Sequence, residues 1–254
     1  MEPTTVERLL DINHQFYQTF AEHFSQTRQR IQPGVRRILE QLPLTANILD
    51  LGCGNGELWR ALVAQGFTGF YIGLDSSQGL LEIARRRVPR ECPKQPIFLD
   101  ADLATDYWVN TLLIHTSVAG DDASSITFNQ IVAFAVLHHL PGFPLRLRLL
   151  NEIYQLLSPE GQFIHSDWQF HNNPKLTERI QPWSMAGLDD AQVDAGDYLL
   201  DWRHGGRGLR YVHQFDEVEL SALAEKSHFQ IGKTFYSDGG NGKSGLYQVW
   251  TAVK

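Results

Sequence analysis

The fold of this chain is decided by one short stretch near its start, ILDLGCGNG at residues 48–56. Its first four residues are apolar except for Asp50 and have the length of a short buried strand. Three alternate glycines then predict a sharp turn, because glycine accepts positive φ angles and lets a ligand approach the backbone closely. Residues 57–65 follow as a predicted helix, whose free N–H groups favour a negatively polarised group such as a carboxylate.

Two acidic residues beside this turn indicate what it binds. Asp50 precedes the first glycine and can bind a cationic group, such as the amino group of an amino acid. Asp75 ends the next predicted strand, residues 70–75, where a carboxylate can accept hydrogen bonds from both hydroxyls of a ribose. The implied ligand has an amino acid at one end and a nucleoside at the other, which describes S-adenosylmethionine. A glycine turn in some other α/β protein is the alternative.

The strand, glycine turn, helix and second acid together resemble motif I of the class I methyltransferases. The resemblance implies a Rossmann-like α/β fold, with S-adenosylmethionine as cofactor and S-adenosylhomocysteine as product. An acid after the third predicted strand could bind the adenine amino group, and we choose Asp102 over Asp100. The loop after the fourth strand should also face the ligand, since open α/β sheets bind ligands at the carboxyl ends of their strands. The predicted cofactor residues are Asp50, Gly52, Cys53, Gly54, Asn55, Gly56, Asp75, Ser76, Asp102, Leu103, Ala135, Val136 and His139.

The rest of the chain alternates helices and strands, which predicts a seven-stranded, mostly parallel sheet closed by an antiparallel hairpin. The remaining predicted helices are residues 4–25, 35–42, 78–88, 103–113, 144–157 and 216–226. The remaining predicted strands are residues 97–99, 126–134, 162–168, 229–236 and 246–253, with a loop at 119–125 and a turn at 158–161. Thr4 with Glu7, and Asp216 with Glu219, are expected to cap their helices.

We expect a single domain with four parts. They are an N-terminal helical cap (1–45), a cofactor-binding core (46–168), an insert (169–209) and a C-terminal helix and hairpin (210–254). The insert breaks the regular alternation, and its position on the ligand side suits a lid over the substrate. A disordered loop is the alternative, which aromatic residues such as Trp183 and Trp202 argue against.

Composition narrows the class of protein. The chain has 254 residues, 43% of them hydrophobic, which fits one α/β domain with additions. Cys53 and Cys92 lack the paired spacing of a disulfide framework or a zinc site. The adjacent His138 and His139 have no evident third ligand, so no metal site is predicted. Without a signal peptide or a long apolar run, we expect a soluble cytoplasmic protein that does not bind membranes.

Charge is distributed unevenly along the chain. The net charge of −7 argues against broad affinity for nucleic acids. Two runs nevertheless contain no acid: residues 28–37 hold four arginines, and residues 203–213 hold three arginines and two histidines. Such patches suit an anionic substrate held in one place, although solvated arginines produce the same pattern.

Four further stretches narrow the family resemblance. They are AEHFSQTR at residues 21–28, AVLHHL at 135–140, SDW at 166–168 and RYVHQF at 210–215. In this order they resemble the tRNA wobble-uridine carboxymethyl methyltransferases, eukaryotic enzymes that methyl-esterify 5-carboxymethyluridine. The resemblance covers most of the chain. It implies tRNA as the substrate and, as in the family, a small zinc-binding activator subunit as a partner.

The chain departs from this family at several positions. Asn129 stands where many relatives have an aspartate before the fourth strand's apolar run. Asn172 and the region 173–209 do not match the family insert in detail. The resemblance therefore supports the reaction class better than the substrate.

The implied reaction suits the residues present. A carboxylate acceptor is already ionised at pH 7, so the enzyme need only bring oxygen and methyl together, exclude water and hold the carboxylate. Arg28 is the first candidate to hold it, because a guanidinium matches a carboxylate bidentately. Arg210, Tyr211 and His213 are second candidates for orienting the substrate, or else structural hydrogen-bonding residues.

Two other functions stay open at this point. A small-molecule O-methyltransferase acting on a carboxylate or hydroxyl is favoured by the acidic net charge and the unmatched insert. A subunit that binds S-adenosylmethionine without activity of its own is the other, although Asp50, the three glycines and Asp75 weigh against a loss of cofactor binding.

Overall fold

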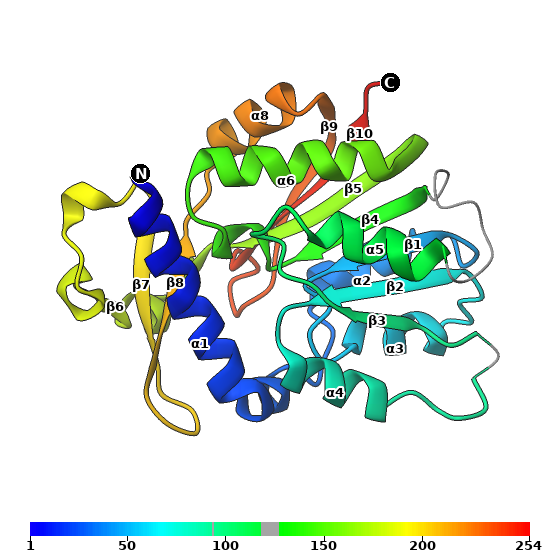
Figure 1. Cartoon of the computed structure of the whole chain (residues 1–254), viewed down its shortest axis with the longest axis horizontal. Coiled ribbons are helices and arrows are strands. Elements are labelled where there is room, and N and C mark those ends of the chain that lie inside the picture. The colour runs from blue at the N-terminus through cyan, green and yellow to red at the C-terminus, as the bar shows by residue number, and fades with distance from the viewer. Residues whose placement is uncertain (93, 118–126) are drawn as a thin grey trace.

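A sheet of seven strands forms the centre of the molecule, in the order β3-β2-β1-β4-β5-β10-β9 (Figure 1). The computed structural model describes residues 1–92, 94–117 and 127–254. Strands β1 to β5 run parallel, and β10 lies antiparallel to both β5 and β9. The bounds are β1 Asn47–Leu51, β2 Phe70–Asp75, β3 Ile97–Asp100, β4 Phe128–Phe134, β5 Leu157–Trp168, β9 Phe229–Ser237 and β10 Gly245–Ala252. The predicted mostly parallel sheet with a closing antiparallel hairpin is confirmed.

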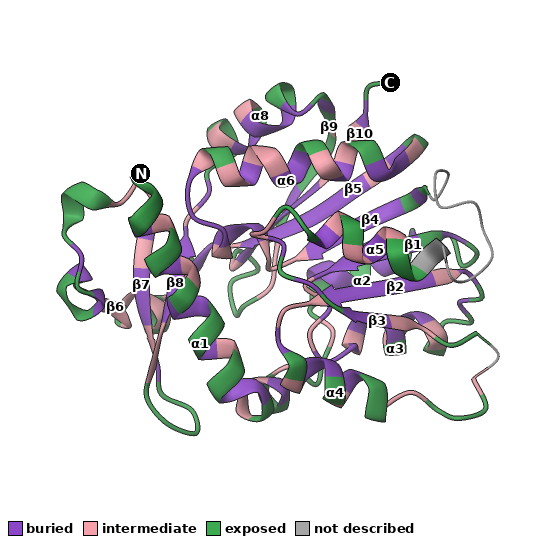
Figure 2. Ribbon diagram, viewed as in Figure 1, coloured by how far each residue is buried: buried purple, intermediate pink, exposed green. Residues whose placement is uncertain are grey.

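Helices cover both faces of this sheet, and the strands are correspondingly buried (Figure 2). One core joins the sheet to α5 (Trp108–Ser117), α6 (Phe143–Leu156) and α8 (Glu217–Lys226). The other core joins it to α2 (Pro33–Leu39), α3 (Glu57–Ala64) and α4 (Gln78–Arg86). Strand β1 contributes to both, because successive side chains point to opposite faces of a strand: Leu49 and Leu51 enter the first core and Ile48 the second.

A second, smaller sheet stands beside the carboxyl ends of the parallel strands. It is antiparallel, in the order β6-β7-β8, with bounds Ile180–Gln181, Asp197–Trp202 and Gly208–His213. The long helix α1 (Pro3–Thr27) lies across it (Figure 1). Leu9 and Ile12 of α1 pack on Leu199 and Tyr211 of the small sheet. The predicted insert therefore contains strands, and β8 joins it to the first residues of the C-terminal part.

Four local predictions differ from the structure. Helix α1 begins at Pro3, whose fixed φ suits the first helical position, and no Thr4–Glu7 capping box forms. Helix α5 begins at Trp108 rather than at residue 103, because Asp102 accepts a hydrogen bond from the Ala104 N–H (2.9 Å) and turns the chain there. The predicted turn at 158–161 is a bulge inside β5, where the pairing with β4 shifts register. The predicted loop 119–125 lies outside the described residues.

The fourth difference concerns the cap of α8. Asp216 does cap this helix, since its side chain accepts a hydrogen bond from the Glu219 N–H (2.8 Å). The Glu219 side chain, however, bonds Arg146 and His213 instead of returning to the start of the helix. Ion pairing across the fold thus replaces one half of the expected capping pair.

Candidate functional site

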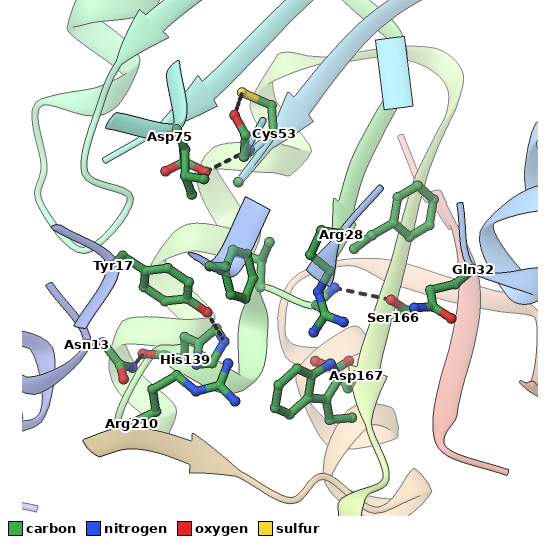
Figure 3. Close-up of a pocket in the computed structure, with 18 of the residues that line it drawn as sticks. Asn13, Tyr17, Arg28, Gln32, Cys53, Asp75, His139, Ser166, Asp167 and Arg210 are labelled. Carbon is green, nitrogen blue, oxygen red and sulfur yellow. Dashed lines mark hydrogen bonds between the residues drawn. The ribbon is translucent and has the colours of Figure 1, made fainter. Parts of the chain in front are cut away.

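A cavity of about 870 Å³ lies at the carboxyl ends of the parallel strands, between the central sheet, α1 and the small sheet. Its walls come from the loops that follow β1, β2, β3 and β4, from the end of β5, and from α1 and β8 (Figure 3). This is the position at which open α/β sheets bind ligands. We call the wall that contains Asp50, residues 52–55, Asp75 and Asp102 the cofactor half.

The glycine turn after β1 is built as the sequence predicts. Gly52 has φ 71°, and a Cβ at this position would lie 2.5 Å from a Val136 methyl carbon. Gly54 has φ 54° and faces open space, so a ligand can approach its backbone. Gly56 differs, because it does not line the cavity. A Cβ there would lie 3.1 Å from Ala84 and Phe98, so this glycine serves helix packing.

Asp75 ties the glycine turn to the end of β2. One of its carboxylate oxygens accepts a hydrogen bond from the Gly54 N–H and the other from the Ser77 N–H, each at 2.8 Å. Burial raises the pKa of Asp75 to about 6, and these two backbone donors oppose the shift. Each carboxylate oxygen has a second lone pair, so Asp75 retains acceptors for the hydroxyls of a ribose.

Asp50 is a buried carboxyl group that no Lys or Arg among the described residues pairs with. It is 3% exposed, and the Tyr71 hydroxyl donates a hydrogen bond of 2.5 Å to it. Burial raises the pKa of Asp50 to about 7, against the effect of this hydrogen bond. A buried acid without a cation costs free energy, which a cationic ligand group would offset. Together, Asp50 and Asp75 fit the amino group and the ribose of S-adenosylmethionine.

The opposite wall is basic and aromatic, and we call it the acceptor half: Tyr17, Phe24, Arg28, Trp168, Arg179, Trp202 and Arg210. Arg210 on β8 is 3% exposed, and its guanidinium carbon lies 4.7 Å from the Trp168 ring and 5.2 Å from the Trp202 ring. Its Nε and Nη1 atoms are buried without a hydrogen-bond partner. Arg28, just after α1, lies 5.5 Å from the same Trp168 ring. Burial lowers the pKa of both arginines.

His139 and Tyr17 connect the two halves. His139 Nδ1 lies 3.1 Å from the Tyr211 carbonyl oxygen, so Nδ1 carries the proton and Nε2 accepts from the Tyr17 hydroxyl at 2.9 Å. Burial lowers the pKa of His139 well below its usual value and raises the pKa of Tyr17, so both groups are neutral. Asn13 fixes this arrangement by donating to the carbonyl oxygens of His139 and Tyr211.

Ser166 and Asp167, near the end of β5, line the same cavity as Arg28 and Arg210 (Figure 3). Ser166 accepts hydrogen bonds from the Ala135 N–H through its carbonyl (2.9 Å) and its hydroxyl (3.1 Å). These bonds hold Ala135 at φ 60°, a backbone conformation that costs about 1 kcal/mol in a residue with a side chain. Asp167 is fully buried; burial raises its pKa, but bonds to His138 and His165 outweigh this and lower it.

Tyr211 and His213 do not line the cavity. Both belong to a buried network behind it, in which the Tyr211 hydroxyl donates to Asp197 (2.7 Å) and accepts from Arg146 (3.0 Å). His213 bonds Asp197 through Nδ1 and Glu219 through Nε2, each at 2.7 Å. Burial lowers the pKa of His213, but these two carboxylates outweigh it and the net shift is upward. The network joins the small sheet to α6 and α8. Both residues therefore lie where structural hydrogen-bonding residues, the alternative left open by the sequence, would lie.

The structure thus brings most of the predicted site residues to one cavity. All the predicted cofactor residues except Gly56 line it, as do Arg28 and Arg210. The sequence analysis missed Tyr17, Arg179 and Trp202, and it used Ser166, Asp167 and Trp168 only for the family resemblance. Ser166, Asp167 and Trp168 had a detectable signal, because they end β5. This buried strand pairs with β4, which in turn pairs with β1, the strand before the glycine turn. Tyr17 gave none, since it looks like one more aromatic residue of an amphipathic helix.

Comparison with known proteins gives a consistent picture. Residues 23–232 match a family model described as a methyltransferase domain. The tRNA (carboxymethyluridine(34)-5-O)-methyltransferase of Arabidopsis thaliana is 32% identical over 84% of this chain and 46% of its own length. The mouse enzyme of that name is 30% identical over 87% of this chain and 26% of its own length, and the Schizosaccharomyces pombe enzyme 29% over 84% and 86%. The chain thus spans less than half the length of the first two.

Solved structures share the fold at low sequence identity. A Methanosarcina mazei S-adenosylmethionine-dependent methyltransferase has a TM-score of 0.61 and 18% identity, covering 87% of this chain and 98% of that one. A Haloferax volcanii chain solved with the Trm112 methyltransferase activator has a TM-score of 0.63 and 14% identity, covering 96% of this chain and 97% of that one.

Among the described residues, no helix has the length and apolar character needed to cross a membrane.

Proposed function

The chain belongs to the methyltransferase-domain family and is an S-adenosylmethionine-dependent methyltransferase, and we propose that it methylates a carboxylate on a tRNA wobble uridine. The observation that carries the carboxylate is Arg210. A buried guanidinium in the acceptor half, with two nitrogen atoms that lack a hydrogen-bond partner, is costly unless an anion binds it. A planar carboxylate matches this donor pattern.

The chain's own residues would act by binding and by excluding water. Bound S-adenosylmethionine supplies an electrophilic methyl group on a sulfonium sulfur. Arg210, assisted by Arg28, would hold the acceptor carboxylate, which is ionised at pH 7 and needs no base. The neutral Tyr17–His139 pair takes no part in proton transfer and fixes the wall between the two halves. Trp168 and Trp202 exclude water from the arginines and so strengthen their hold on the anion.

A tRNA base is supported by two observations. The relatives that match over most of this chain are named for methylating carboxymethyluridine at tRNA position 34. Aromatic side chains in the acceptor half also suit a base drawn out of a single-stranded loop, because such bases stack on aromatic and guanidinium planes. The carboxylate and the tRNA therefore enter the proposal together.

The test is a methyl-transfer assay with labelled S-adenosylmethionine. The purified protein is incubated with total tRNA and, separately, with a small-molecule extract. We expect label in tRNA that mild alkali removes, because a methyl ester hydrolyses there. Label only in the small-molecule extract would contradict the tRNA substrate, and alkali-stable label in tRNA would contradict the carboxylate.

An activator subunit is a separate part of the proposal. It is supported by the family resemblance, and the Haloferax volcanii chain of the same fold was solved in complex with such an activator. We expect methyl transfer to rise when a Trm112-type protein from the same cells is added to the purified chain. Equal rates with and without it, together with separate elution in gel filtration, would contradict this part.

A further inference from the structure

Resting on the function proposed above, we propose that Arg179 binds a backbone phosphate of the nucleotide whose base enters the acceptor half. It would thereby select a nucleotide over a small carboxylic acid. Arg179 lines the cavity from the insert, beside the first strand of the small sheet. The cationic subsite would be additional to the arginines that hold the carboxylate.

Arg179 is held in place by its backbone. Its carbonyl oxygen accepts a hydrogen bond from the Asp201 N–H of β7 (2.9 Å), and its N–H donates to the Leu176 carbonyl (3.0 Å). Leu176 and Ile180, on either side of it, pack against the cluster of Phe170, Leu200 and Val212. The side chain therefore projects from the framework of the small sheet.

The guanidinium of Arg179 is nevertheless free to take a ligand. It is half-buried, and within the described part of the chain its side chain forms no hydrogen bond or ion pair. Arg203, one strand away, behaves in the opposite manner: it is 57% exposed, and its Nε lies 2.6 Å from an Asp201 oxygen. A half-buried cation that faces a cavity without a counter-ion fits an anion supplied by the substrate.

The acceptor half contains the guanidinium groups of Arg28, Arg179 and Arg210. Asp167 and Asp238 also line the cavity, but Asp167 bonds His138 and His165, and Asp238 accepts hydrogen bonds from the Gly34 N–H and the Tyr247 hydroxyl. Burial is the main cause of the lowered pKa of Arg210, and the positive charges of Arg28 and Arg179 lower it further, so all three interact electrostatically. Arg28 and Arg210 both lie against the Trp168 ring, whereas Arg179 contacts none of the described aromatic rings in this way. One carboxylate beside Trp168 would leave Arg179 unpaired.

A nucleotide carries two anions of the required kind. The base carries the carboxylate, and the ribose carries phosphates that extend toward solvent. Arginine binds phosphate bidentately, as it binds a carboxylate. A small carboxylic acid would satisfy the arginines at Trp168 and leave the Arg179 charge uncompensated. The protein would therefore bind a nucleotide more tightly than a small carboxylic acid, because only the nucleotide places an anion at Arg179.

The experiment compares 5-carboxymethyluridine with its 3′,5′-bisphosphate, both as methyl acceptors and as ligands followed by tryptophan fluorescence. The proteins are the wild type, Arg179→Gln, Arg179→Lys, and Arg203→Gln as the matched control. Arg203→Gln removes the same charge from the same small sheet outside the cavity. We expect Arg179→Gln to weaken the binding of the bisphosphate and to lower its kcat/KM about tenfold. The affinity and kcat/KM for the nucleoside should not change. Arg179→Lys should restore part of the loss for the bisphosphate.

The outcomes separate this inference from the function on which it rests. Equal wild-type affinity for nucleoside and bisphosphate, or equal losses for both in Arg179→Gln, would overturn the phosphate subsite while leaving methyl transfer intact. The same change in Arg203→Gln would also overturn it, because net charge alone would then be the cause. Conversely, an Arg179-dependent preference for the bisphosphate without methylation of either compound would retain the subsite and contradict the proposed acceptor.

Discussion

The two halves of the cavity differ in charge and in origin. The cofactor half presents the buried Asp50 and the half-buried Asp75 from the ends of adjacent parallel strands. The acceptor half presents Arg28, Arg179 and Arg210, which come from the end of α1, the insert and β8. A cationic, hydroxylated ligand suits the first wall and an anionic one the second. One cavity can thus receive two ligands in fixed places, because each wall lacks the charge that its ligand supplies.

The largest effect is expected from a substitution that alters the acceptor half alone. Arg210→Gln removes the guanidinium from its aromatic surroundings, and we expect kcat/KM for tRNA to fall about a thousandfold. Binding of S-adenosylmethionine, measured by calorimetry, should change less than threefold because Asp50 and Asp75 are untouched. Arg28→Ala is expected to act in the same direction with cofactor binding retained. Equal losses of cofactor affinity would show that the two halves are not separable.

The next largest effect is expected from a substitution that alters the cofactor half alone. Asp75→Asn keeps the size of the side chain but removes the charge that orders Gly54 and accepts ribose hydroxyls. We expect S-adenosylmethionine to bind about thirtyfold more weakly, in line with the loss of charge-assisted hydrogen bonds. Binding of the acceptor nucleotide should stay within threefold of wild type. A weaker acceptor in this variant, with normal cofactor affinity, would contradict the assignment of the halves.

The affinities of the two ligands should depend differently on pH. Since burial holds the pKa of Asp50 at about 7, its carboxylate forms as pH rises from 5.5 to 7.5. Binding of a cationic amino group should therefore tighten about tenfold over that interval. Asp50→Asn should abolish this dependence. The acceptor arginines stay charged throughout, so the affinity of a carboxylate ligand should change little.

Folding stability carries the opposite sign for Asp50. Its pKa is higher in the folded protein than in the unfolded chain, so the folded state binds the proton more tightly. Asp50 therefore contributes stability that is present below pH 4 and is lost as pH rises through about 7 in the ligand-free protein. Thermal unfolding of wild type and Asp50→Asn across this range measures the difference. A flat difference between the two proteins would contradict the raised pKa.

The smallest effect on catalysis is expected behind the cavity. Tyr211→Phe removes the hydroxyl that joins Asp197 to Arg146, so we expect the free energy of unfolding to fall by about 2 kcal/mol. Its kcat should stay within twofold of wild type, because Tyr211 does not line the cavity. Urea unfolding and single-turnover methyl transfer provide the two measurements. A large fall in kcat at unchanged stability would return Tyr211 to the reacting groups.

The two halves also differ in how far the sequence predicts them. Residues 48–56 and Asp75 are local patterns in which each strand end is followed by a turn, so spacing together with the motif I resemblance predicts the cofactor wall. Tyr17 reaches the cavity because α1 crosses the small sheet, and Arg179 because its segment pairs with β7. Both are long-range contacts that no local pattern encodes. Tyr211 and His213 lie outside the cavity for a related reason. Alternate residues of one strand face opposite sides, so Arg210 enters the cavity while its neighbour Tyr211 points away.

Local turn chemistry accounts for the errors in helix and strand bounds. After β3, the Asp102 side chain accepts a hydrogen bond from the Ala104 N–H and forms a turn, so α5 begins later than expected. Asp102 also lines the cavity, as predicted. Glu160, at φ 63°, bends β5 without ending it. A side chain that bonds its own backbone, as at Asp102, and a residue with positive φ, as at Glu160, decide these boundaries, and hydrophobic periodicity detects neither.

The function proposed for this protein requires that the acceptor half hold a carboxylate on a tRNA base. The most direct test is to react tRNA whose wobble uridine carries a carboxymethyl group with S-adenosylmethionine and the protein, then digest it to nucleosides for mass spectrometry. We predict that carboxymethyluridine gains one methyl group, that mild alkali removes it, and that Arg210→Gln prevents the gain while Arg203→Gln does not. A methyl group on the ribose or on a ring atom, stable to alkali, would contradict the account.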